Sequence, residues 1–132
     1  MQKCSGMALI IIFVAFLLIG CSQAAITEFT QTKNGIVAVF NMSPVSPTMM
    51  EPTILSLHLT DADSVPLEGA QVTYDLTMPG MSMPPNQPDA LEINPGVYTA
   101  DAAFTMSGDW RVAMTVFYNG ETTTFIFDIS IK

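Results

Sequence analysis

The chain has 132 residues, with 12 acidic residues against four basic ones and a formal net charge of −8. This length allows one small domain, and the acidic balance argues against binding to nucleic acid or to anionic lipid headgroups. The two cysteines, Cys4 and Cys21, both lie near the N-terminus. The rest of the chain therefore has no thiol for a disulfide, a thiolate ligand or a nucleophile.

The first 21 residues have the pattern of a bacterial lipoprotein leader. Lys3 precedes an apolar run over 7–19, which has the length of a signal-peptide core and is short for a membrane span. The run ends in Leu-Leu-Ile-Gly-Cys at 17–21, which resembles a lipobox, in which the cysteine becomes the lipidated first residue of the mature chain. A plain signal peptide with a chance cysteine is the alternative.

The lipobox reading divides the chain into three parts. Residues 1–20 are expected to be a cleaved signal peptide, 21–27 the lipidated Cys21 and a tether, and 28–132 the folded domain. The lipid, palmitate included, would anchor the protein to a membrane of the cell envelope, outside the cytoplasm.

Two-residue alternation of apolar and polar side chains recurs along the domain, and no segment has a sustained helical period. Turn signals at Asn34-Gly35, 94–96 and Asn119-Gly120 separate several of these runs. The predicted strands cover 29–33, 36–42, 53–60, 71–78, 91–94, 97–105, 110–116 and 122–131. Seven to eight short strands predict an all-β fold, an antiparallel β-sandwich of immunoglobulin-like type.

The methionines are distributed unevenly over this predicted topology. In an antiparallel fold, alternate connections lie at opposite ends of the sandwich. The second-to-third, fourth-to-fifth and sixth-to-seventh connections should therefore share one end. Those connections and their borders carry Met42, Met49, Met50, Met78, Met81, Met83 and Met106. We expect these seven methionines at or near one end, with Met114 in the core.

Met78, Met81 and Met83 are spaced along a stretch that Pro79, Gly80 and two further prolines keep out of regular structure. Thioether sulfur is a soft ligand that suits Cu(I). We expect these three residues to be the metal ligands, with Met106 as a candidate replacement. Glu51 and Asp89 are candidate weak oxygen donors.

Each methionine also has a structural interpretation. Met78 and Met106 continue apolar strand faces, so core packing explains them as well as ligation does. Met81 and Met83 are harder to explain by packing. A metal-free module that docks through the same Met/Pro loop remains an alternative, and so does an oxidant-sensing role, because exposed thioethers form sulfoxides.

Histidine and catalytic signals are sparse. His58 is the one histidine, and the strand register predicts a solvent-facing side chain roughly 16 Å from the methionines. Without imidazole nearby, Cu(II) and zinc have no good site, which favours Cu(I). The sequence also has no cysteine nucleophile in the domain and no phosphate-binding loop, so we do not expect an enzyme.

Five segments together resemble the YtkA-like domain family. They are Leu-Thr-Asp-Ala-Asp at 59–63, Val-Pro-Leu-Glu-Gly-Ala-Gln-Val at 65–72, Met-Pro-Gly-Met-Ser-Met at 78–83, Pro-Gly-Val-Tyr at 95–98 and Phe-Thr-Met-Ser-Gly-Asp-Trp at 104–110. The resemblance covers about 44–131. It implies an extracytoplasmic immunoglobulin-like sandwich, similar to FixH-type oxidase accessory proteins and copper-resistance sandwiches. It also implies partners among envelope oxidase-assembly or copper-transport proteins. Relatives often place histidines beside the methionine loop, and this chain departs from that pattern.

Overall fold

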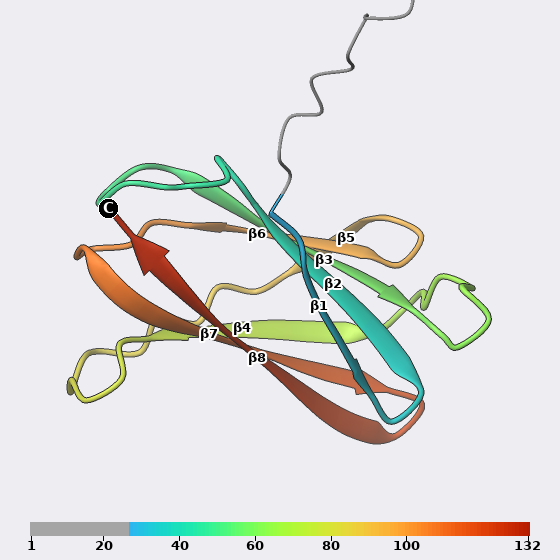
Figure 1. Cartoon of the computed structure of the whole chain (residues 1–132). Helices are drawn as coiled ribbons and strands as arrows, with labels where there is room; N and C mark the ends of the chain where they lie inside the picture. The colour runs from blue at the N-terminus through green and yellow to red at the C-terminus, as the bar shows by residue number, and fades with distance from the viewer. Residues whose placement is uncertain (1–26) are drawn as a thin grey trace, which may run out of the picture.

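A computed structural model describes residues 27–132, which form eight strands in two antiparallel sheets (Figure 1). The predicted signal peptide, the lipidated Cys21 and the tether up to residue 26 lie outside the described residues. Within 27–132 no helix has the length and hydrophobicity needed to cross a bilayer. The predicted all-β sandwich of antiparallel strands is confirmed.

The strands are divided between the two sheets in short runs along the chain. They are β1 (Phe29–Lys33), β2 (Ile36–Ser43), β3 (Thr53–Thr60), β4 (Gln71–Thr77), β5 (Leu91–Asn94), β6 (Val97–Ala102), β7 (Gly108–Tyr118) and β8 (Glu121–Ile131). The first sheet has the order β1-β2-β3-β6-β5 and the second has the order β4-β7-β8. The chain therefore crosses between sheets after β3, β4 and β6.

The two tight hairpins form where the sequence predicted them. Asn34 and Gly35 have φ values of 51° and 74°, and Asn119 and Gly120 have φ values of 50° and 80°. Positive φ at both central residues matches the twist of antiparallel strands, and Asn-Gly tolerates it well. These turns set the registers of β1 with β2 and of β7 with β8.

The core lies between the sheets and is built from alternate residues of nearly every strand. The largest fully buried side chains are Trp110, Tyr74, Tyr98, Phe40, Phe104, Phe125, Leu55, Leu57, Leu59, Leu76, Met114 and Val112. Phe104 and Trp110 meet edge to face, with ring centroids 5.2 Å apart. Such a pair stabilises the end of the sandwich at which the chain passes from β6 to β7.

β6 is shorter than the sequence predicted. Alternation continues through Phe104, which is buried, so the sequence predicted a strand to residue 105. The strand ends at Ala102 because 103–107 leave the first sheet and cross to β7 in the second. Phe104 is still buried in the core, although its backbone belongs to the connection and not to the strand.

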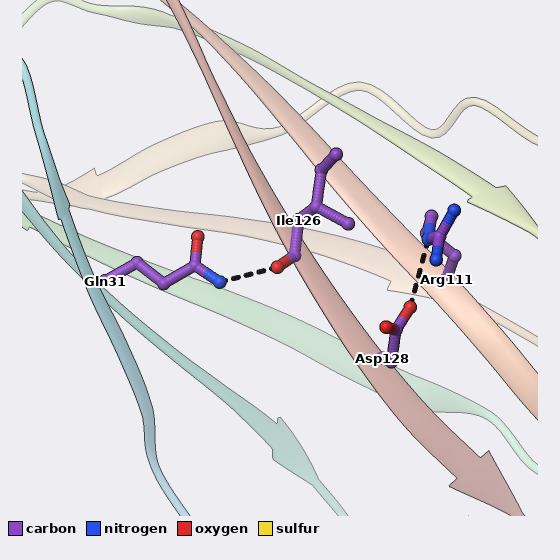
Figure 2. Close-up of polar contacts among 4 residues, drawn as sticks. All are labelled: Gln31, Arg111, Ile126 and Asp128. Atoms are coloured by element: carbon purple, nitrogen blue, oxygen red, sulfur yellow. Dashed lines mark hydrogen bonds and ion pairs between the residues drawn. The ribbon is translucent and has the colours of Figure 1, made fainter.

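Both edges of the second sheet are covered by other parts of the chain. Beside β8, the Gln31 side-chain amide donates to the Ile126 carbonyl at 2.6 Å (Figure 2), and Lys33 Nζ donates to the Thr124 carbonyl at 2.8 Å. Beside β4, the returning segment 86–90 exchanges backbone hydrogen bonds with Val72, Tyr74 and Leu76. Covered edges offer few free backbone groups for pairing with another chain.

Candidate metal site at the methionine end

Three connections gather at one end of the sandwich, and we call this end the methionine pole. It comprises 44–52 between β2 and β3, 78–90 between β4 and β5, and 103–107 between β6 and β7; Figure 1 shows all three on the left. Met49 N–H donates to the Lys132 carbonyl at 2.9 Å, and Met50 N–H donates to the Phe104 carbonyl at 2.8 Å. The predicted clustering of these connections at one end is confirmed.

The loop after β4 begins with a tight turn. Met81 N–H donates to the Met78 carbonyl at 3.1 Å, and Gly80 has a φ of 81°. Proline at the second position and a positive-φ glycine at the third are the requirements of a type II turn. Pro79 and Gly80 therefore fold Met81 back beside Met78. The side chain of Met81 is 51% exposed, so its thioether is open to solvent.

Met83 turns its sulfur toward the base of this loop. The Met78 N–H donates to the Met83 sulfur at 3.3 Å, and both side chains are half-buried against the core. Thioether sulfur is a weak acceptor with two lone pairs, so this bond leaves one pair free. The contact holds two of the predicted ligand residues together without consuming the donor capacity of either one.

Met106 comes from the neighbouring connection and lies close to the same loop. The Met78 terminal methyl is 3.1 Å from the position that a β-carbon on Gly108 would occupy, two residues after Met106. Trp110 Nε1–H donates to the Met106 carbonyl at 2.9 Å, which ties the connection to the core, and the Met106 side chain is half-buried. The structure thus brings Met78, Met83 and Met106 to one region of the pole.

The remaining methionines separate into exposed and buried groups. Met49 and Met50 are 53% and 61% exposed on the first connection of the pole. Met42, on β2, is buried, and Met114 lies in the core as predicted.

The candidate oxygen and nitrogen donors are poorly placed for this site. The Glu51 carboxylate accepts hydrogen bonds from the Thr48 N–H at 2.9 Å and from the Thr48 hydroxyl at 3.0 Å. Asp89, near the end of the 78–90 connection, forms a bridge with Thr73, about four residues or 13 Å along β4 from the start of the 78–83 loop, and so lies away from the three methionines of that loop. His58 is exposed and pairs with Val97 near the opposite end of β3, as predicted.

The donor chemistry of the pole fits a soft metal ion. Within residues 27–132, no three His, Cys, Asp or Glu side chains form a group that could hold a metal. The donors that do gather here are neutral thioethers, which suit Cu(I) and suit Cu(II) or Zn²⁺ poorly.

The sequence did not reveal a groove beside the loop. Its volume is 660 Å³, and its walls include Pro52, Met83, Pro84, Pro85, Ala102 and Ala103. A second hollow of 460 Å³ lies on the Pro79 side, next to the Arg111–Asp128 ion pair of 3.0 Å (Figure 2). The Pro84-Pro85 pair was visible in the sequence, but a groove also needs the ends of β3 and β6, which only the sheet order brings alongside.

The opposite end of the sandwich is held by a polar network rather than by methionines. The Tyr98 hydroxyl donates to the Leu67 carbonyl at 2.6 Å and accepts from the Ala70 N–H at 3.0 Å. Desolvation raises the pKa of Tyr98. The Glu92 carboxylate accepts from the Gly69 and Gly96 N–H groups, and these hydrogen bonds lower the pKa of Glu92.

The fold and the loop sequence at the pole match a known domain family. The profile of the YtkA-like family matches residues 30–115, more than half of the chain, so the chain belongs to the YtkA-like family. The match begins at residue 30, whereas the resemblance seen in the sequence began at about residue 44. It ends at residue 115, within β7. No curated protein gives a significant sequence match.

Two solved structures share the fold. A DUF4426 family protein from Pseudomonas aeruginosa has a TM-score of 0.57 at 16% identity, covering 79% of this chain and 94% of its own. The PmoD soluble domain from Methylocystis sp. Rockwell has a TM-score of 0.55 at 10% identity, covering 78% of this chain and 96% of its own. At these identities the likeness establishes the sandwich fold.

Proposed function

We propose that this protein is a lipid-anchored accessory protein of the cell envelope that holds Cu(I) through the thioethers of the methionine pole. Its acceptor would be an envelope oxidase-assembly or copper-transport protein. The YtkA-like domain is an extracytoplasmic type of domain, and this supports the location. In this proposal the protein binds and presents the metal and is not an enzyme.

The observation that carries the proposal is the hydrogen bond from the Met78 N–H to the Met83 sulfur. It holds one of the proposed ligand sulfurs, that of Met83, against the backbone at the start of the loop before a metal arrives. Met81, folded back by the turn and half-exposed, is the donor that an incoming ion or partner would reach first. In this proposal Met106, on the neighbouring connection, would replace one of these three. When bound, Cu(I) would find neutral sulfur donors that leave its charge uncompensated, which favours transfer over permanent storage.

The test is a Cu(I) titration of residues 22–132, which include the whole sandwich, against a chromogenic chelator under anaerobic, reducing conditions. We expect one equivalent to bind. The double variant Met81→Leu with Met83→Leu should lose binding, because leucine keeps the apolar volume and removes the sulfur. The matched control is Met49→Leu with Met50→Leu, which removes two exposed thioethers from another connection of the same pole.

The control distinguishes a defined site from general thioether affinity. Equal losses in both double variants would contradict ligation by the 78–83 loop. Failure of the unmodified domain to compete with the chelator would contradict copper binding altogether. Circular dichroism of each variant should retain the strand signal, because neither pair lies in a strand.

The alternative is a metal-free interaction module that docks through the same Met/Pro loop. The groove between Pro52 and Pro84 favours it, because a proline-lined hollow with Asp101 and Asn86 among its polar lining residues can accept a side chain from an envelope protein. Methionine surfaces adapt readily to a partner. Under this alternative, the Met81→Leu and Met83→Leu pair would leave partner binding nearly unchanged, whereas Ala103→Glu in the groove wall would abolish it.

A further inference from the structure

Charge is distributed very unevenly between the two ends of the sandwich. Residues 44–50, 78–88 and 103–107 of the methionine pole contain no charged side chain. At the opposite end, the connection between β3 and β4 carries Asp61, Asp63 and Glu68. The charged residues nearest these stretches are Glu51, which is hydrogen bonded to Thr48, and Lys132, whose carbonyl accepts from the Met49 N–H; Asp89 lies at the far end of the 78–90 connection. The net negative charge of the whole chain therefore comes mainly from residues outside these loop stretches.

Four of the ten exposed large apolar side chains within residues 27–132 lie at this end, and the other six are spread over the strands and the β3–β4 connection. Val45, Met49, Met50 and Met81 are 40%, 53%, 61% and 51% exposed. All four lie within these uncharged stretches of the connections. Scattered exposed apolar residues are normal on a soluble surface, but a charge-free group at one tip indicates a surface that meets an apolar environment.

The chain also enters the sandwich from this side. β1 runs antiparallel to β2, and Phe29 pairs with Phe40, three residues before β2 ends at the pole. The predicted lipid site, Cys21, lies eight residues before Phe29, which is about 28 Å at full extension. Phe29 itself lies only about 10 Å along the strand from the pole. A tether of this length lets the tip of the pole reach the bilayer that holds the lipid.

We propose that the methionine pole lies on the phospholipid bilayer in which Cys21 is anchored, with Val45, Met49, Met50 and Met81 in the headgroup region. An anionic bilayer would repel the acidic far end and so favour the same orientation. The proposal rests on the lipid anchor of the proposed function and not on its copper site. A failed Cu(I) titration would therefore leave it intact.

The test uses the full chain, lipidated in a bacterial host and reconstituted into phosphatidylcholine–phosphatidylglycerol vesicles. Met49→Cys and, in a separate protein, Val65→Cys are labelled with an environment-sensitive fluorophore. The native residues are both apolar and both 53% exposed, at opposite ends of the sandwich. We expect brominated lipids to quench the probe at position 49 at least about threefold more than the probe at position 65.

Several outcomes would overturn the proposal. Equal quenching at the two positions would mean that the domain has no preferred orientation. Shielding of position 49 in native membranes but not in protein-free vesicles would indicate a protein partner instead. Shielding that requires neither lipid nor partner and rises with protein concentration would indicate a second copy of the chain. A mass spectrum without an acyl group on Cys21 would remove the anchor on which the proposal rests.

An unlabelled protein provides a second readout if a labelled variant does not fold. Val65→Met introduces an oxidisable side chain at the far end of the sandwich. On vesicles, a water-soluble oxidant should convert Met49 and Met50 to sulfoxides several-fold more slowly, relative to position 65, than it does in the lipid-free domain. Unchanged relative rates would contradict contact between the pole and the bilayer.

Discussion

Gly96, in the turn between β5 and β6, has neighbours where a β-carbon would stand. That position is 2.7 Å from the Leu59 carbonyl oxygen and 2.9 Å from the Pro66 β-carbon, and the φ of Gly96 is 73°. The Gly96 carbonyl accepts from the Leu59 N–H at 2.8 Å, so this close approach is part of the hydrogen-bonded structure. Gly120 has a similar φ of 80° but no atom within 4 Å of its virtual β-carbon.

This difference separates backbone strain from steric overlap. Gly120→Ala should lower the free energy of unfolding by about 1 kcal/mol, the cost of a left-handed alanine. Gly96→Ala should lower it by about 3 kcal/mol, because overpacking against fixed backbone adds to that cost. Urea unfolding of both variants checks the prediction. Equal losses would show that the connection at Leu59 and Pro66 moves aside freely.

At the scale of elements, the Glu92 carboxylate joins the β3–β4 connection to β5 and β6. It accepts from Gly69 N–H at 2.9 Å and from Gly96 N–H at 3.1 Å, beside the Tyr98 hydroxyl that binds Leu67 and Ala70. β5 has only four residues and a register shift after Glu92, so its ladder alone holds it weakly. The side-chain bonds compensate for that short ladder.

This network makes stability depend on pH. The hydrogen bonds from Gly69 and Gly96 lower the pKa of Glu92 below its ordinary value of 4.5. The stabilisation is therefore present above the unfolded pKa and is lost as the pH falls through the folded pKa. We expect Glu92→Gln to unfold at lower urea than the unmodified protein at pH 7, with a gap that narrows below about pH 4.5. Glu68→Gln is the control, and an equally wide Glu92 gap at pH 3 would contradict the prediction.

Across the whole molecule, the fold sorts the methionines by exposure. Met49, Met50 and Met81 are more than half exposed, Met78, Met83 and Met106 are half-buried, and Met42 and Met114 are buried. The exposed and half-buried groups share one end of the sandwich. Because all these side chains have the same intrinsic chemistry, differences in their reactivity report the tertiary structure.

Limited oxidation with hydrogen peroxide should follow this order. Met49, Met50 and Met81 should become sulfoxides first, followed by Met78, Met83 and Met106, while Met42 and Met114 should react only on unfolding. Peptide mass spectrometry at short times measures each site. Early oxidation of Met114 would contradict the arrangement of the core.

Much of the architecture was predictable from local patterns. The alternation around Leu55 and Val112 predicted strands and their buried faces, and Asn34-Gly35 predicted a hairpin. The position of the three methionine-bearing connections at one end followed from a single rule, that alternate connections between antiparallel strands lie at the same end. The end of β6 was predicted three residues too late, because Phe104 alternates like a strand residue while its backbone crosses to the other sheet.

The sequence by itself determined the strands, the turns and the end of the molecule at which the methionines lie, because period-two alternation and turn residues act over a few neighbouring positions. The tertiary structure alone decided which side chains meet there. The bond from Met78 N–H to the Met83 sulfur, the contact of Met78 with Gly108 and the displacement of Asp89 along β4 depend on how loops from different strands pack. Such contacts arise between residues brought together by the sheet order, and no local pattern encodes them.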